Sequence, residues 1–123
     1  MHPLLEKEHQ QLIDLLDALD KCIVKGDSAN QVHKYLSEFV ALAEKHFRNE
    51  EIIMETWKYT ERKDHTKEHA DLLDQLFVLK NKLDSGSTPF GEEYMKSLRK
   101  WLEEHLLDAD NRLDKFLYQI NAK

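Results

Sequence analysis

Residues 46–50 read HFRNE and residues 65–69 read HTKEH, and these two stretches decide how the chain folds around its interior. In each stretch the first and last side chains can bind a metal and stand four residues apart. Four residues are about one turn of an α-helix, so the two side chains lie on one face of their helix. The pairs are His46 with Glu50 and His65 with His69. Such pairs on two neighbouring helices predict a metal site between them.

The composition of the chain points to one helical domain. Its 123 residues are enough for a single hydrophobic core, and we expect residues 1–123 to form a single domain. Only three glycines and two prolines occur, which favours helices over strands and tight turns. The net charge of −6 argues against nucleic acid or an anionic membrane as a partner.

Apolar runs in this chain are short. None approaches the roughly 18 residues that span a bilayer, and the N-terminus lacks the pattern of a signal peptide. We therefore expect no direct membrane insertion and a cytoplasmic location. Cys22 is the only cysteine, so no intramolecular disulfide can form, and its place near the end of an apolar stripe predicts a buried thiol.

The spacing of apolar residues predicts four helices. Gly26 suits a left-handed C-cap, and Thr88 followed by Pro89 suits the start of the last helix. The inward-facing stripes are expected to reach Trp57 in the second helix and Ile120 in the fourth. Short connections between the helices predict an all-α, antiparallel up-down-up-down four-helix bundle. The predicted helices cover residues 3–25, 29–57, 61–83 and 89–120.

Polar residues interrupt these apolar stripes at one height in the bundle. They are His9, His46, Glu50, His65, His69 and His105. In an antiparallel pair of helices, residues equally far from the turn lie side by side, and counting from each turn brings these residues to one level. Burying them without a metal would leave donors and acceptors unsatisfied, at roughly 1–3 kcal/mol each. The stripes therefore predict a metal centre.

The donor types narrow the choice of metal. A set rich in imidazole, with carboxylates and no thiolate, suits iron, and suits manganese or zinc less well. Five histidines and two carboxylates are too many for one ion, so we expect two. A ferritin-like di-iron site fits poorly, because only Glu6 and His9 have the Glu-x-x-His spacing. Near His105, either Asp108 or Asp110 could supply the second carboxylate, and ideal helical geometry slightly favours Asp108.

The metal-capable residues follow one another in a recognisable order. His9 comes first, then H-x-x-x-E at 46–50, H-x-x-x-H at 65–69 and H-x-x-x-x-D at 105–110. This order resembles the complete ligand signature of the hemerythrins, particularly the bacterial hemerythrin-like domains. The sequence WLEEH at 101–105 is similar as well. The resemblance covers nearly the whole chain and implies Asp110, not Asp108, as the ligand.

The resemblance implies a non-haem di-iron centre with an oxo or hydroxo bridge. One iron would be held by His65, His69 and His105, the other by His9 and His46, with Glu50 and Asp110 bridging both. Dioxygen would bind at an open position on the two-histidine iron, and azide or another small anion would occupy it in the oxidised form. Phe47, Leu102 and Trp101 would line this pocket and keep it dry.

The function implied by the resemblance is dioxygen binding without turnover, so the chain is not expected to be an enzyme. Bacterial members usually carry an N-terminal arm before the first helix, whereas His9 comes almost at once here, which would open a route to the centre. We therefore expect an oxygen or redox sensor, with a C-terminal output domain such as a diguanylate cyclase or chemoreceptor, or else an oxygen carrier or storage protein. The alternative is a di-iron enzyme that acts on peroxide or nitric oxide.

Overall fold

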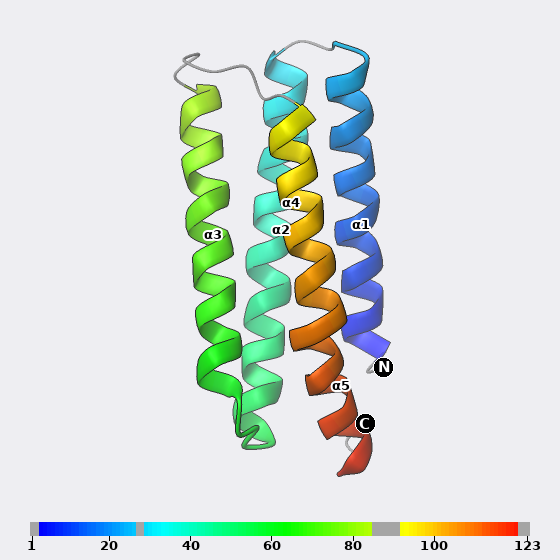
Figure 1. Cartoon of the computed structure of the whole chain (residues 1–123), viewed down its shortest axis with the longest axis vertical. Helices are drawn as coiled ribbons and strands as arrows, with labels where there is room; N and C mark the ends of the chain where they lie inside the picture. The colour runs from blue at the N-terminus through cyan, green and yellow to red at the C-terminus, as the bar shows by residue number, and fades with distance from the viewer. Residues whose placement is uncertain (1–2, 27–28, 85–91, 121–123) are drawn as a thin grey trace.

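The computed structural model describes residues 3–26, 29–84 and 92–120, and these residues form helices. Figure 1 shows the helices packed side by side, with the chain rising through the first, descending through the second, rising again through the third and descending through the last. The prediction of an all-α four-helix bundle is confirmed. The elements are α1 (Pro3–Val24), α2 (Ala29–Thr56), α3 (Arg62–Asp84), α4 (Glu92–His105), the π-helical turn η1 (Leu106–Asp110) and α5 (Asn111–Gln119).

The predicted fourth helix differs from the observed one. It was expected to run unbroken over residues 89–120, but the π-helical turn η1 divides it into α4 and α5. In such a turn the backbone hydrogen bond spans five residues, so the helix gains one residue at that point. The predicted start at Thr88 and Pro89 falls on residues 85–91, which lie outside the described ranges.

Buried apolar residues form two clusters along the bundle, separated by the level of the polar residues. The larger cluster includes Leu16, Phe39 and Leu76, and the smaller one includes Met54 and Leu113. Each fully buried side chain of this size contributes about 1.5–3 kcal/mol to folding. The buried polar residues therefore lie between two packed apolar layers, which hold the helices that carry them in place.

The expected core stripes end sooner than predicted at two positions. Trp57 is 43% exposed and Ile120 is 39% exposed. Each lies just beyond the last residue of its helix, Thr56 or Gln119, where the chain no longer follows the helical period. The thiol of Cys22 is buried, as predicted. Within the described ranges no helix is both long enough and apolar enough to cross a bilayer.

Two helix ends have the left-handed cap that stops a helix. Gly26 follows α1 with φ 71°, as predicted for this glycine. After α2 the same place is taken by Lys58, with φ 54°. The backbone N–H of Tyr59 then bonds the carbonyl of Met54 at 2.8 Å, and that of Lys58 bonds the carbonyl of Glu55 at 3.2 Å, which is the Schellman pattern. This cap turns the chain into α3, and so sets the register between α2 and α3.

Candidate metal centre

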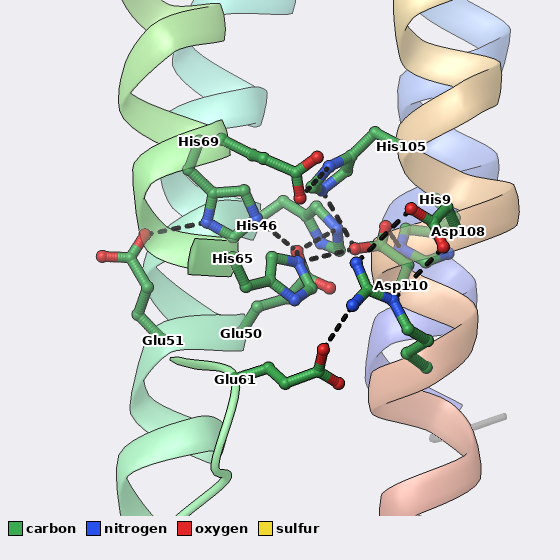
Figure 2. A network of polar contacts seen from close by, with 12 residues as sticks. His9, His46, Glu50, Glu51, Glu61, His65, His69, His105, Asp108 and Asp110 are labelled. Atoms are coloured by element: carbon green, nitrogen blue, oxygen red, sulfur yellow. Dashed lines mark hydrogen bonds and ion pairs between the residues drawn. The ribbon is translucent and has the colours of Figure 1, made fainter. Parts of the chain in front are cut away.

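All seven residues predicted as metal ligands come together in the interior of the bundle. Figure 2 shows their side chains converging from helices on both sides of the centre. Each is buried among the packed helices. They come from α1 (His9), α2 (His46, Glu50), α3 (His65, His69), the end of α4 (His105) and the end of η1 (Asp110).

The donor atoms fall into two groups that share their carboxylates. Within each group, one donor atom from every residue lies within 4.8 Å of the others. The three-histidine group contains His65, His69 and His105, the two-histidine group contains His9 and His46, and both contain Glu50 and Asp110. Two cation positions with two carboxylates between them are therefore compatible with this arrangement.

Glu50 reaches both groups through one oxygen. Its Oε1 lies 3.3 Å from Nε2 of His46, one turn earlier on α2, and 3.1 Å from Nε2 of His69 on α3. The same oxygen lies 3.9 Å from Nε2 of His65. The carboxylate thus stands between imidazoles of the two-histidine and three-histidine groups.

Asp110 reaches both groups with separate oxygens. Its Oδ1 lies 2.9 Å from Nε2 of His65 and 3.0 Å from Nε2 of His105. Its Oδ2 lies 3.0 Å from Nε2 of His9. One oxygen therefore faces each group, as a bridging carboxylate requires.

The π-helical turn explains why Asp110, and not Asp108, joins the centre. On an ideal α-helix, a residue five positions after His105 points well away from it. A π-helical turn brings residues five apart onto one face, and η1 places Asp110 beside His105. The side chain of Asp108 is 71% exposed and pairs with Arg112 at 3.2 Å.

Unsatisfied polar atoms are concentrated at this centre. Ten buried side-chain nitrogen or oxygen atoms among the described residues lack a hydrogen-bond partner, and only Ser37 Oγ belongs to a residue outside the seven. The Nε2 atoms of His46 and His69 lie within ion-pair distance of Glu50 but without hydrogen-bond geometry. Each orphaned atom would cost about 1–3 kcal/mol. Cations placed among these lone pairs would satisfy them, so the residues fit a metal centre.

The electrostatics of the cluster favour a bound cation. Burial, and then the charge of Asp110, raise the pKa of Glu50 well above its usual value. Burial together with the neighbouring imidazoles lowers the pKa of His69 to about 2, so this ring is neutral and can act as a ligand. Burial alone would raise the pKa of Asp110, but the imidazoles of His105, His65 and His9, each about 3 Å from its oxygens, outweigh burial and hold that pKa far below its usual value. The interior thus holds a neutral His69 ring beside the anionic carboxylate of Asp110, an arrangement that favours a bound cation.

Two carboxylates that were not predicted from the sequence hold the outward nitrogens of His46 and His69. Nδ1 of His46 donates to Glu8 Oε1 at 2.9 Å, and Nδ1 of His69 donates to Glu51 Oε2 at 3.0 Å. Such partners fix the orientation of a metal-binding imidazole. Glu8 could have been found from its spacing, since it lies three residues after Leu5 and four before Leu12, on the buried face of α1.

The predicted pocket residues lie close to the imidazoles. Phe47 is buried and stacks on His69, with ring centroids 4.0 Å apart and planes 9° apart. Trp101 stacks on His105 at 5.1 Å and 10°, on the solvent side of the ring. Leu102 is buried in the larger apolar cluster. Phe47 therefore borders the centre from within the core, whereas Trp101 covers it from outside.

A surface cavity of about 450 Å³ lies next to Trp101. It is lined by Glu68, Trp101, Glu104, His105 and Asp108. His105, a member of the three-histidine group, forms its floor, and three carboxylates stand at its rim. The cavity therefore reaches one member of the three-histidine group, and its acidic lining is favourable for cations.

Comparison with known proteins gives a consistent match. The chain fits the family model "Hemerythrin HHE cation binding domain" over residues 1–117. It is 29% identical over 106 residues to myohemerythrin-1 of Phascolopsis gouldii, covering 86% of this chain and 77% of that protein. Identity to the bacteriohemerythrin of Methylococcus capsulatus is 23% over 105 residues, covering 85% and 79%.

A third relative and the cofactor of the family agree with this match. The myohemerythrin of Theromyzon tessulatum is 32% identical over 75 residues, covering 61% of this chain and 57% of that protein. No solved structure gives a significant match. The hemerythrin family binds a di-iron centre, and the buried imidazole–carboxylate cluster could hold such a pair of ions. The chain belongs to the hemerythrin family.

Proposed function

We propose that this chain is a dioxygen-binding domain with two non-haem irons held inside the bundle. The observation that carries the proposal is the division of the donors into two groups that share both carboxylates. In this assignment His65, His69 and His105 hold one iron, His9 and His46 hold the other, and Glu50 and Asp110 belong to both. Imidazoles and carboxylates without thiolates are the donors expected for iron.

The two groups differ by one protein donor, which bears on where an external ligand would bind. The three-histidine group offers five residues and the two-histidine group offers four. The second iron would therefore be the one with a position left for dioxygen, or for azide or another small anion when oxidised. When bound, the iron pair supplies the electrons for reversible dioxygen binding. Phe47 contributes by keeping water from the imidazoles, because its ring covers His69 within the core.

The test is a cycle of anaerobic iron loading, exposure to oxygen and removal of oxygen, followed by absorption spectroscopy. We expect a spectrum that appears with oxygen and disappears on its removal over repeated cycles. Chain loaded with Zn²⁺, which has no redox chemistry, is the control and should show no such change. Sustained consumption of peroxide or nitric oxide without a reversible spectrum would contradict binding and favour the alternative, a di-iron enzyme.

Within this proposal, we favour an oxygen or redox sensor over a carrier or storage protein. The supporting observation is η1, which joins His105 to Asp110 directly before α5. A π-helical turn can exchange with the regular α-helical hydrogen-bonding pattern. A change at His105 or Asp110 that shifts this balance would alter the position of α5. A C-terminal output domain, such as a diguanylate cyclase or chemoreceptor, would then receive the signal. The proposal includes one domain over residues 1–123 and a cytoplasmic location.

Hydrogen exchange tests the sensor proposal. Amides of α5, residues 111–119, should exchange at different rates in the deoxygenated and oxygenated states, by about 10-fold for a coupling of 1.4 kcal/mol. Amides in the middle of α1, residues 12–19, lie in the larger core cluster and serve as the internal control. Equal exchange rates in α5 in both states would favour a carrier.

A further inference from the structure

Glu8 is a third carboxylate in the interior, beside the two shared by the histidine groups. Only 3% of the residue is exposed, and both of its oxygens are engaged. Oε1 accepts a hydrogen bond from Nδ1 of His46 at 2.9 Å, and Oε2 accepts one from Nδ2 of Asn49 at 2.6 Å. These two bonds tie α1 to α2 at the level of the centre.

We propose that Glu8 is a positioning residue that fixes the tautomer of His46 and makes this imidazole an electron-rich ligand of the two-histidine iron. The inference rests on the proposed di-iron function and deepens it. Since the chemistry of the carboxylate allows it only to accept, Nδ1 of His46 must carry the proton. A neutral imidazole has one N–H, so Nε2 then presents a lone pair.

The surroundings of His46 Nε2 agree with this assignment. The atom lies 3.3 Å from Glu50 Oε1, yet it makes no hydrogen bond and is fully buried. Two lone pairs facing each other at this distance are unfavourable unless a cation lies between or beside them. The contact with Glu8 therefore leaves His46 ready to bind a metal.

Asn49 keeps Glu8 in the position where it can act on His46. Asn49 stands three residues after His46 on α2, so both donors to Glu8 come from the same face of one helix. With both oxygens bonded, the carboxylate cannot rotate away without losing two hydrogen bonds. In the low-dielectric interior, such charge-assisted bonds are stronger than the same bonds in water.

The three-histidine group has carboxylate partners of a different kind. Nδ1 of His69 lies 3.0 Å from Glu51, and Nδ1 of His105 lies 3.7 Å from Glu68. The side chains of Glu51 and Glu68 are 38% and 43% exposed, whereas that of Glu8 is 4% exposed. Solvent screens the first two charges and not the third. Negative charge therefore acts more strongly on the two-histidine iron, the one with fewer protein donors, and favours its oxidised state.

The variant Glu8→Gln tests this inference, with Glu51→Gln as the matched control. In both variants the charge is lost while the amide oxygen can still accept the bond from imidazole Nδ1. In Glu8→Gln the amide nitrogen takes the place of Oε2, so the bond from Asn49 is kept only if the Asn49 amide turns to present its oxygen. We expect Glu8→Gln to weaken iron binding about 10- to 100-fold, the usual effect of losing a partner of a metal-bound histidine, and to raise the reduction potential of the iron pair. Glu51→Gln should change affinity by less than about 3-fold, because its charge is screened. Affinity is measured by anaerobic titration against a competing chelator, and potential by spectroelectrochemistry.

The outcomes separate this inference from the proposed function. A wild-type chain that binds no iron would overturn both. A wild-type chain that binds iron, with Glu8→Gln and Glu51→Gln equal in affinity and potential, would overturn the role of Glu8 alone. Melting of the metal-free variants shows whether each still folds. If metal-free Glu8→Gln is unfolded, Asn49→Ala replaces it as the test variant. Asn49→Ala keeps the charge of Glu8 but removes the hydrogen bond that holds this carboxylate in place. A raised reduction potential of the iron pair in this variant supports the inference, and an unchanged one contradicts it.

Discussion

Replacing Glu50 with glutamine is expected to destroy iron binding and, at the same time, to stabilise the metal-free chain. Glu50 is the residue that faces both histidine groups through one oxygen, so its loss removes a donor from each. Losing only a partner of a ligand costs 10- to 100-fold in affinity, and losing a shared ligand should cost about 100-fold or more. Iron bound per chain after anaerobic loading and gel filtration is the measurement.

The expected gain in stability has a separate cause. Burial and the charge of Asp110 raise the pKa of Glu50 in the folded chain. A carboxyl group with a raised pKa contributes its stability at low pH and loses it as pH rises from the unfolded value toward the folded one. Glutamine has no charge to bury. The free energy of unfolding of metal-free Glu50→Gln should therefore exceed that of the metal-free wild type by on the order of 1 kcal/mol at pH 7, and by less at pH 5.

The control for this pair of effects is Glu55→Gln, on an exposed carboxylate five residues further along α2. It should bind iron like the wild type, and its metal-free stability should change by less than about 0.5 kcal/mol. A Glu50→Gln chain that keeps its iron would show that this carboxylate is not a ligand. A metal-free Glu50→Gln chain less stable than the wild type would show that Glu50 supports the fold in its own right.

Removing the iron should lower the melting temperature of the wild-type chain by about 12–16 °C. Metal at about 1,000 times its dissociation constant adds roughly 4 kcal/mol to the stability of the state that binds it. For a domain of this size, each kcal/mol corresponds to about 3–4 °C. The cause lies in the buried imidazole nitrogens and carboxylate oxygens of the centre that lack a hydrogen-bond partner among the described residues. Thermal melts monitored by circular dichroism before and after treatment with a chelator provide the measurement.

Glu50→Gln is the internal control for this experiment. A chain that holds no iron should melt at the same temperature with and without the chelator, so any shift in that variant would be an effect of the chelator itself. Equal melting temperatures for iron-loaded and iron-free wild type would contradict the account, because they would mean that the bundle holds its polar interior without a metal.

The sequence predicts the parts of this structure that follow the ideal helical period. Apolar residues such as Leu16 and Leu76 recur at helical spacing and are buried in the core. The pair His46 and Glu50 stands four residues apart on α2, so their convergence needs nothing beyond a regular helix. Trp57 was placed wrongly because the period was extended past the end of α2.

The parts that depend on departures from the period could not be predicted from spacing. Asp110 reaches His105 only because η1 adds a residue to the helix, and ideal geometry favoured Asp108 instead. The resemblance to the hemerythrins, not the spacing, gave Asp110. Glu8 was missed for another reason: its spacing from Leu5 and Leu12 places it on the buried face of α1, but in a chain with 34% charged residues a glutamate next to a lysine is normally a surface residue. Only the contacts with His46 and Asn49 show why it is buried.

The most direct test of the two-iron centre is an anaerobic titration of the metal-free wild-type chain with Fe²⁺, with protein concentration fixed by amino-acid analysis and folding checked by circular dichroism. The account predicts saturation at two irons per chain. A folded chain that saturates at one iron, or that binds none, would contradict it.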